Sequence, residues 1–178
     1  MHVAVHPKFA SNGFIYLSYT KAPSGSASMV SAVARARYVE GRLTDVKDVW
    51  VGDAFLGPVA IAMAPDAKLY IAASGLSGAL AQDPSQSAGK VLRLNDDGTV
   101  PADNPFAEHG GITAQIWTLG HRNPLGLAFD ANGRLWNTEM GPQHGDELNL
   151  VIRGENYGYP IVSNGDHYDG KVIPDHDT

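Results

Sequence analysis

The chain contains no cysteine. This absence excludes disulfide bonds, thiolate catalysis and cysteine-ligated zinc or iron–sulfur sites. Positive charge is also scarce, because Lys and Arg total 13 against 19 Asp and Glu, which gives a formal net charge of -6. The basic residues are scattered singly, whereas nucleic-acid affinity depends on clustered Lys and Arg. We therefore expect no nucleic-acid partner.

Long apolar runs are missing as well. The longest run, Val59 to Ala64, falls far short of the ~18 residues that a membrane-spanning helix needs, so we expect no membrane insertion. The first residues, Met1 to Pro7, lack the basic start and apolar core of a signal peptide. The sequence by itself leaves the compartment open.

Turn-forming residues are abundant in a chain that is still apolar. The 178 residues include 20 Gly and 11 Pro, and 43% are hydrophobic, which is enough for one domain with a real core. Aromatic and β-branched runs between Gly, Pro, Asn and Asp predict an all-β fold. The expected strands span 14–19, 29–38, 49–51, 59–64, 69–73, 90–94, 115–119, 125–129, 134–138 and 147–152. The one possible helical segment is a short turn around 77–82.

An internal repeat indicates how the strands are organised. Residues 61–75 align without gaps on 127–141. A third copy, made of residues 3–7 followed by residues 12–16, fits the same template with a longer turn. Each copy is a strand, a tight turn and a strand, which cannot bury its own apolar face, so copies must stack. Stacked units of this kind predict a β-propeller. A β-sandwich, whose hairpins also repeat, stays open as the alternative.

Polar residues are densest between 120 and 160. Arg122 and Asn123 precede Pro124, which favours an extended Asn123. A guanidinium and an amide presented together suit a flat ligand that is rich in carboxylates and carbonyls. The plainer interpretation is that the arginine ties down loop carbonyls.

Two further features in this segment could serve a hard cation. Gly141 and Pro142 can expose two successive carbonyl oxygens, which are good calcium ligands, although an ordinary turn is the commoner meaning of Gly-Pro. Asp146 and Glu147 follow, and adjacent strand residues face opposite sides, which disfavours a shared acid–base role. A solvated turn carboxylate is the alternative for Asp146. The seven histidines show no zinc-binding spacing.

At these positions the sequence resembles a known family. The segments GHRNP (120–124), EMGPQHGDE (139–147) and NYGYP (156–160), with VAVHPKFASNGFIYLSYT (3–20) and GKVLRLNDDGTVPADNPF (89–106), occur in order over nearly the whole chain. They are similar to motifs of the glucose/sorbosone dehydrogenases, which are soluble quinoproteins that use pyrroloquinoline quinone (PQQ).

The resemblance implies a six-bladed propeller with calcium and a quinone at the mouth of its channel. It implies that Arg122 and Asn123 contact the quinone oxygens, and that Gly141 and Pro142 give main-chain oxygens to the calcium that holds the quinone. Glu147 and the Tyr157 carbonyl would belong to a second, structural calcium site. The implied reaction oxidises an aldose at C1 to the lactone and passes electrons to an external acceptor. Members are usually periplasmic or secreted.

One departure from the family puts activity in doubt. The family has a catalytic His just before the strand that starts the 61–75 repeat, where it removes the sugar hydroxyl proton. Here residues 53–60 contain no His or Arg, and Leu56 or Gly57 stands at that position. The catalytic residue is therefore unknown, and His121 or His144 is a possible substitute. A non-catalytic binding or structural propeller module is the rival interpretation. A lactonase-like calcium propeller would need a carboxylate ring that the sequence does not supply.

The second departure is length. We expect 178 residues to form about three to four blades as one partial domain, with blades at approximately 1–55, 56–120 and 121–178. An open half-propeller leaves two unpaired sheet edges and an exposed apolar surface. Either the chain is a fragment of a longer protein, or two copies form a homodimer that closes the ring.

Overall fold

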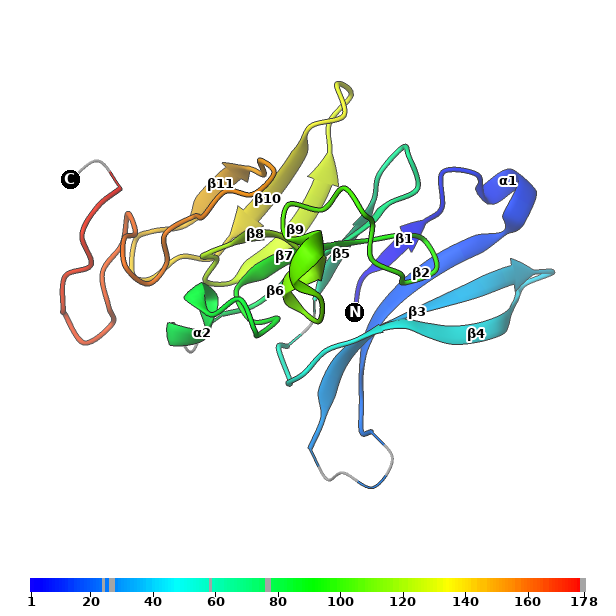
Figure 1. The fold of residues 1–178 in the computed structure, drawn as a ribbon, viewed down its shortest axis with the longest axis horizontal. Coiled ribbons are helices and arrows are strands. Elements are labelled where there is room, and N and C mark those ends of the chain that lie inside the picture. The colour runs from blue at the N-terminus through cyan, green and yellow to red at the C-terminus, as the bar shows by residue number, and fades with distance from the viewer. Residues whose placement is uncertain (24, 26–27, 58, 76–77, 177–178) are drawn as a thin grey trace.

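Three antiparallel sheets follow one another along the chain in this computed structural model, which describes residues 1–23, 25, 28–57, 59–75 and 78–176. Figure 1 shows them in chain order, from sheet A at the blue and cyan end through sheet B in green to sheet C in yellow and orange. Sheet A contains β1 (Val3–Val5), β2 (Phe14–Lys21), β3 (Val30–Val39) and β4 (Arg42–Val51). Sheet B contains β5 (Ala60–Met63), β6 (Leu69–Ala73), β7 (Lys90–Leu94) and β8 (Ile116–Leu119). Sheet C contains β9 (Pro124–Phe129), β10 (Leu135–Glu139) and β11 (Glu147–Leu150).

Helices are few and short. The described residues form α1 (Phe9–Asn12), α2 (Ala79–Gln82) and the 3-10 turns η1 (Ala107–His109) and η2 (Thr113–Gln115). Helix α2 lies within the segment where a short helical turn was expected, although Ser77, within that segment, is outside the described residues. Nowhere in the described part of the chain is a helix long and apolar enough to cross a bilayer.

The first strands of the three sheets lie next to one another. Strands within each sheet are ordered as in the chain, and β1 contacts β5 while β5 contacts β9. The array is therefore part of a β-propeller with β1, β5 and β9 innermost, and the two-layer sandwich is excluded. The sheets span residues 3–51, 60–119 and 124–150. The expected blade boundaries near 55 and 120 remain predictions.

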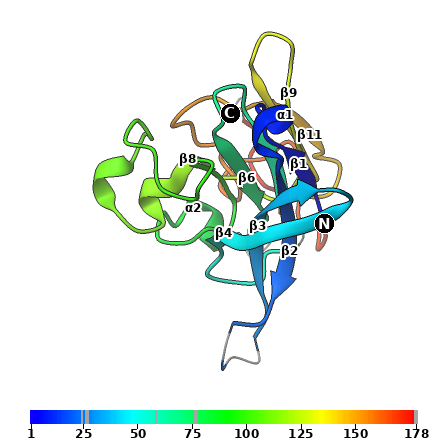
Figure 2. The same ribbon diagram turned by 90° about the vertical axis from the view of Figure 1, so that its right-hand side faces the viewer.

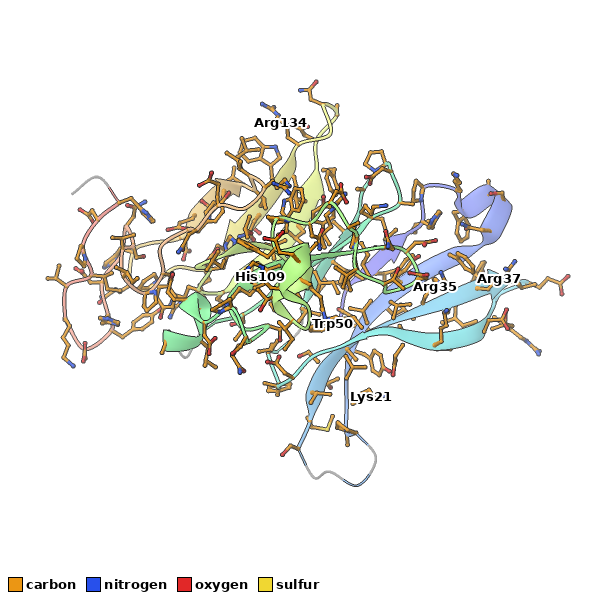
Figure 3. All side chains as sticks on the ribbon, in the orientation of Figure 1. Lys21, Arg35, Arg37, Trp50, His109 and Arg134 are labelled. Carbon is orange, nitrogen blue, oxygen red and sulfur yellow. The ribbon has the colours of Figure 1, made fainter. Side chains whose placement is uncertain are left out.

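Apolar cores fill the two boundaries between sheets. The core between sheets A and B includes Tyr16, Val33 and Ile61, and Trp50 also lies in it. Trp50 Nε1 donates to Gln115 Oε1 at 3.2 Å. Figure 3 shows Arg35 and Trp50 where the two sheets meet, and Figure 2 views the array with sheet A in front.

The second core joins sheets B and C. The Tyr70 ring packs edge-on against Trp117 at 5.6 Å and against Phe129 at 5.4 Å between centroids. Leu135 and Val151 are buried in the same cluster. These contacts fix sheet C on sheet B and so position the loop that leads into β9.

Candidate functional site

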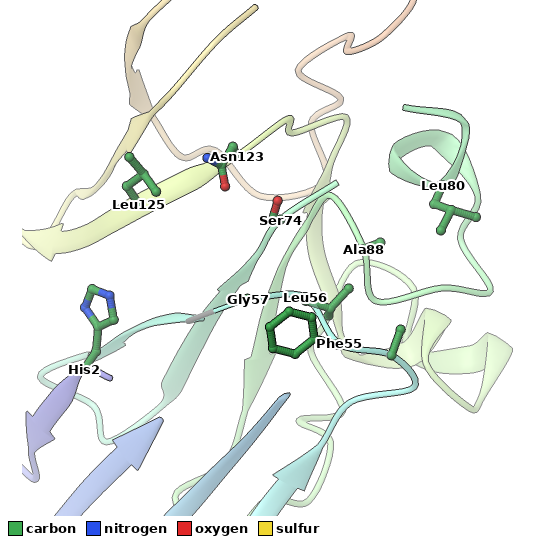
Figure 4. Close-up of a pocket in the computed structure, with 10 residues that line it drawn as sticks. His2, Phe55, Leu56, Gly57, Ser74, Leu80, Ala88, Asn123 and Leu125 are labelled. Carbon is green, nitrogen blue, oxygen red and sulfur yellow. The ribbon is translucent and has the colours of Figure 1, made fainter. Parts of the chain in front are cut away.

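The loops that enter the inner strands border one cavity. Residues 120–123 lead into β9, and residues 53–57 and 59 precede β5. A cavity of about 690 Å³ lies between them (Figure 4). Its lining is mostly apolar and consists of His2, Ala54, Phe55, Leu56, Gly57, Ser74, Leu80, Ala88, Asn123 and Leu125.

Asn123 presents a polar group to this cavity. Its backbone is fixed, because its carbonyl accepts a hydrogen bond from Met140 N at 3.0 Å. Its side chain lies on the cavity wall, on the same side as Ser74 (Figure 4). Within the described residues the amide has no hydrogen-bond partner, so it is available to a ligand.

Arg122 is held in a different way from Asn123. Its side chain is buried, and its Nη1 donates to the carbonyls of Met140, at 3.0 Å, and Gly141. The guanidinium carbon lies 5.6 Å from the ring centre of Tyr168, within cation–π range. The structure thus brings the two loops together, and in this arrangement Arg122 ties down loop carbonyls.

Glu139, at the end of β10, organises the 120–123 loop. Its carboxylate accepts hydrogen bonds from Arg122 N, from Asn123 N at 3.3 Å and from His121 Nδ1 at 2.9 Å. Asn137 Nδ2 donates to it as well, at 2.9 Å. Burial by itself would raise the pKa of Glu139, but these hydrogen bonds and the His121 charge outweigh burial and lower it. Glu139 lies in the segment 139–147 that sequence analysis singled out, but no role was predicted for it.

His121 is not available to a substrate. Its side chain has no exposed surface, and its ring lies between Thr118 Oγ1, 2.8 Å from Nε2, and Glu139. It also stacks on the Tyr157 ring at 4.5 Å. His144 is exposed and does not line the cavity. Neither of the two expected substitutes therefore reaches the cavity.

The expected position of a catalytic base is apolar. Leu56 is buried and Gly57 adopts a φ of 72°, and both line the cavity. The cavity's one histidine among the described residues is His2, which sequence analysis did not single out. Burial and the neighbouring N-terminal ammonium lower the pKa of His2, which favours the neutral form of its imidazole.

Gly141 and Pro142 lie in a tightly folded loop. A Cβ on Gly141 would lie 1.6 Å from the Gly145 carbonyl oxygen, which explains the glycine. The Gly141 carbonyl accepts from the Arg122 guanidinium and the Pro142 carbonyl accepts from Gly145 N at 3.1 Å. Because one oxygen faces a positive charge and both already accept hydrogen bonds, this pair as placed does not fit a calcium ion.

Glu147 and Tyr157 do lie together, in a separate polar cleft. The cleft has a volume of about 530 Å³ and is lined by Asp146, Glu147, Leu148, Asn149, Asn156, Tyr157, Asn164 and His176. Asn149 Nδ2 donates to Glu147 at 2.9 Å. Carboxylate, amide and carbonyl oxygens are the donors that calcium prefers, so this lining fits the ion. No group of three or more His, Asp or Glu side chains poised for a metal occurs in the described ranges.

Asp146 lines the polar cleft and closes the loop, and it does not line the larger cavity. Its Oδ1 accepts from Gly141 N at 3.1 Å, and the side chain is largely exposed. This hydrogen bond closes the turn from Gly141 to Asp146 within the segment 139–147. The structure gives Asp146 a local structural contact.

Comparison with known proteins shows which family and which proteins the whole chain is similar to. The family model described as glucose/sorbosone dehydrogenase matches residues 1–178. Quinoprotein glucose dehydrogenase B of Acinetobacter calcoaceticus is 36% identical over 90% of this chain and 39% of its own length. Aldose sugar dehydrogenase YliI of Escherichia coli is 35% identical over 98% of this chain and 49% of its own length.

Solved structures show the same relationship in three dimensions. The apo form of the soluble aldose sugar dehydrogenase from Escherichia coli superposes with a TM-score of 0.87 at 33% identity, over 98% of this chain and 53% of that chain. The PQQ-bound form of aldose sugar dehydrogenase from Streptomyces coelicolor gives 0.75 at 32% identity, over 89% of this chain and 47% of that chain. The chain thus spans about half the length of the relatives it matches.

Proposed function

The chain belongs to the glucose/sorbosone dehydrogenase family, and from this membership we propose that it carries part of a PQQ-dependent sugar dehydrogenase site. The proposed reaction oxidises an aldose at C1 to the lactone and delivers the electrons to an external acceptor. The observation that carries the proposal is the family match over the whole chain, together with the Asn123 amide on the wall of a large cavity. The name of the Acinetobacter relative, a quinoprotein, supports the choice of cofactor.

Different residues of this chain would contact or support different parts of a bound quinone. When bound, PQQ supplies an oxidant that accepts two electrons as hydride. The Asn123 amide is free to donate to a carbonyl or carboxylate oxygen in the cavity, and the apolar wall at Leu56 and Leu125 suits a flat ring. Arg122 supports Asn123 by fixing the Met140 and Gly141 carbonyls. Arg122 would also add positive charge to the loop that presents Asn123, which would favour an anionic ligand.

Calcium binding is proposed for the polar cleft alone. Glu147 and Tyr157 line it, and its amide and carboxylate oxygens form a suitable donor set. The Gly141 and Pro142 carbonyls do not fit a second ion, so no step of the reaction is assigned to them.

The same cavity argues for impaired catalysis. Leu56 and Gly57 offer no proton acceptor where the family has its His. Loss of a general base typically slows a reaction ~10²–10⁴-fold. This apolar wall favours a second candidate function, a propeller module that binds the cofactor or a sugar without turnover.

A two-step experiment tests the proposal. PQQ is titrated into the protein with and without Ca²⁺ while the cofactor absorbance is followed, and then glucose and a redox dye are added. We expect saturable binding with slow dye reduction. Asn123→Ala should weaken PQQ binding about 10-fold or more, whereas Asn132→Ala, at an exposed turn, should not. PQQ binding without any turnover would select the non-catalytic module, and absence of PQQ binding would refute both the dehydrogenase and a module that binds the cofactor.

A further inference from the structure

Sheets A and C each have one face on which no described sheet packs. Sheet B covers one face of sheet A through the first core and one face of sheet C through the second. Val3 and Val5 on the inner strand of sheet A are 57% and 53% exposed. Ala128 on the inner strand of sheet C is exposed as well. These two surfaces are called the A face and the C face below.

The inner strands carry one repeated pattern. Each has a large apolar residue, an alanine and another large apolar residue, and side chains alternate between the two faces of a strand. The alanine therefore points one way and the large residues point the other. The three copies are Val3-Ala4-Val5, Ile61-Ala62-Met63 and Leu127-Ala128-Phe129.

Both packed boundaries use this pattern in the same way. Between sheets A and B, Ala4 of the earlier sheet shares a core with Ile61 and Met63 of the later sheet. Between sheets B and C, Ala62 shares a core with Leu127 and Phe129. The rule of assembly is an alanine face against a large-residue face, which lets the two sheets approach closely.

The A face and the C face each lack the partner face that this rule requires. The A face presents the large residues Val3 and Val5, and the C face presents Ala128. The apolar character extends outward on both. Cross-strand partners lie on the same face: Leu17 and Ile15 oppose Val3 and Val5 in β2, and Trp136 opposes Ala128 in β10.

We propose that two copies of this chain pair head to tail, with the A face of each on the C face of the other. The chain covers 52% and 53% of two related solved chains that it superposes on with TM-scores of 0.87. Three sheets are then half of the full array, and a rotation of 180° brings a second copy's C face onto the free A face. A two-fold axis repeats this contact, so the ring closes with two copies and no face is left over.

The first test is the mass of the chain in solution. A single chain is 18.9 kDa, and sedimentation should show twice that mass. The proposed dimer contains the contact between an A face and a C face twice. Val5→Asp or Ala128→Lys places one charge in each of these two contacts, so each variant should weaken dimerisation about 100-fold or more. Val46→Asp, at a residue 60% exposed on β4, and Ala102→Lys, at an exposed loop, are the matched controls and should remain dimeric.

Mixing the two variants distinguishes head-to-tail pairing from other modes. A mixed dimer has one unaltered contact and one altered contact. In the altered contact, the aspartate introduced into the first variant meets the lysine introduced into the second, so the two charges are opposite. The 1:1 mixture should therefore dimerise although neither variant does alone.

A disulfide provides an independent readout. Because the chain has no cysteine, the double variant Val5→Cys and Ala128→Cys should form cross-linked dimers and no other species on oxidation.

Three outcomes would overturn the proposal. The first is a stable monomer, which is expected if further sheets of a longer polypeptide cover these faces. The second is an open filament. The third is a dimer that Val5→Asp disrupts and Ala128→Lys does not, since this pattern indicates A face on A face. Val5 and Ala128 are exposed in the single chain, so both variants should fold. Circular dichroism of each variant checks this.

Discussion

At the scale of single residues, Glu139 controls the loop that faces the cavity. Its side chain is 5% exposed, and it is the common acceptor for two consecutive backbone N–H groups and the His121 ring. A buried carboxylate is costly unless hydrogen bonds compensate for lost hydration. Here the compensation comes from the 121–123 segment itself, so the charge and the loop conformation stabilise each other.

Replacing Glu139 should therefore destabilise the fold in a pH-dependent way. Glu139→Gln removes charge-assisted hydrogen bonds and should lower the free energy of unfolding by about 2–4 kcal/mol at pH 7. The folded-state pKa is lowered, so this stability is present above the ordinary pKa of a glutamate and is lost as pH falls through the folded value. Urea unfolding from pH 7 to pH 3 should show the two proteins converging in acid. Glu108→Gln, at an exposed turn, is the control, and a constant difference across pH would contradict the assignment.

A base introduced at Leu56 should raise activity. Leu56 lines the cavity, and Leu56 or Gly57 stands where the resemblance implies the family's His, so Leu56→His should raise the rate of dye reduction by about 10²–10⁴-fold. The gain should follow the deprotonation of one group near pH ~6.5. Leu56→Phe, which changes the wall without supplying a base, should give no gain. Equal rates in both variants would show that the absent histidine is not what limits the reaction.

At the scale of elements, sequence patterns located strands wherever both faces are buried. Strands β6 and β7 have the predicted bounds, because every residue in them is buried and the apolar run ends at turn residues. Strand β4 begins at Arg42, well before the predicted 49–51, since it is an edge strand whose first seven residues are exposed and carry no alternation of burial. Helix α1 was missed, because four residues are too few for a helical period.

The site could be predicted only in part, because some of its contacts join residues that are far apart in the sequence. The motifs around Arg122 and Gly141 indicated two loops of interest, and the structure brings the loops into contact. The role of Glu139 depends on hydrogen bonds to residues 16 to 18 positions away in sequence. The place of His2 on the cavity wall depends on the packing of sheet A against sheet B. Neither is encoded in local spacing.

The loop between β10 and β11 is the element most sensitive to side-chain volume. Gly141→Ala would place a Cβ against the Gly145 backbone carbonyl, and relieving the clash must shift the carbonyls that Arg122 holds. We expect a loss of about 2–3 kcal/mol in unfolding free energy together with weaker PQQ binding. Gly133→Ala is the control, because a Cβ there meets nothing within 4 Å, and it should cost about 1 kcal/mol from its positive φ alone. Equal losses in both variants would contradict the tight packing of this loop.

At the scale of the whole molecule, stability is divided between two boundaries. Sheets A and C meet sheet B through separate cores, so each outer sheet depends on its own boundary, as in repeat proteins whose units contact only their neighbours. Sheet B is the shared element, so we expect that either outer sheet can loosen while the other stays packed. The cavity needs both boundaries, because its lining comes from Leu125 of β9 in sheet C and from segments next to the strands of sheets A and B, including His2, residues 54–57 and Ser74.

Two matched tyrosine variants test this division. Tyr70 packs on Trp117 and Phe129 at the boundary of sheets B and C, and Tyr16 is buried in the core between sheets A and B. Each change to alanine should cost about 3 kcal/mol or more. Hydrogen exchange should show Tyr70→Ala losing protection first in β9–β11 and Tyr16→Ala first in β1–β4, because local opening follows the weakened boundary. Uniform loss of protection across all three sheets in both variants would show instead that the array unfolds as a single cooperative unit.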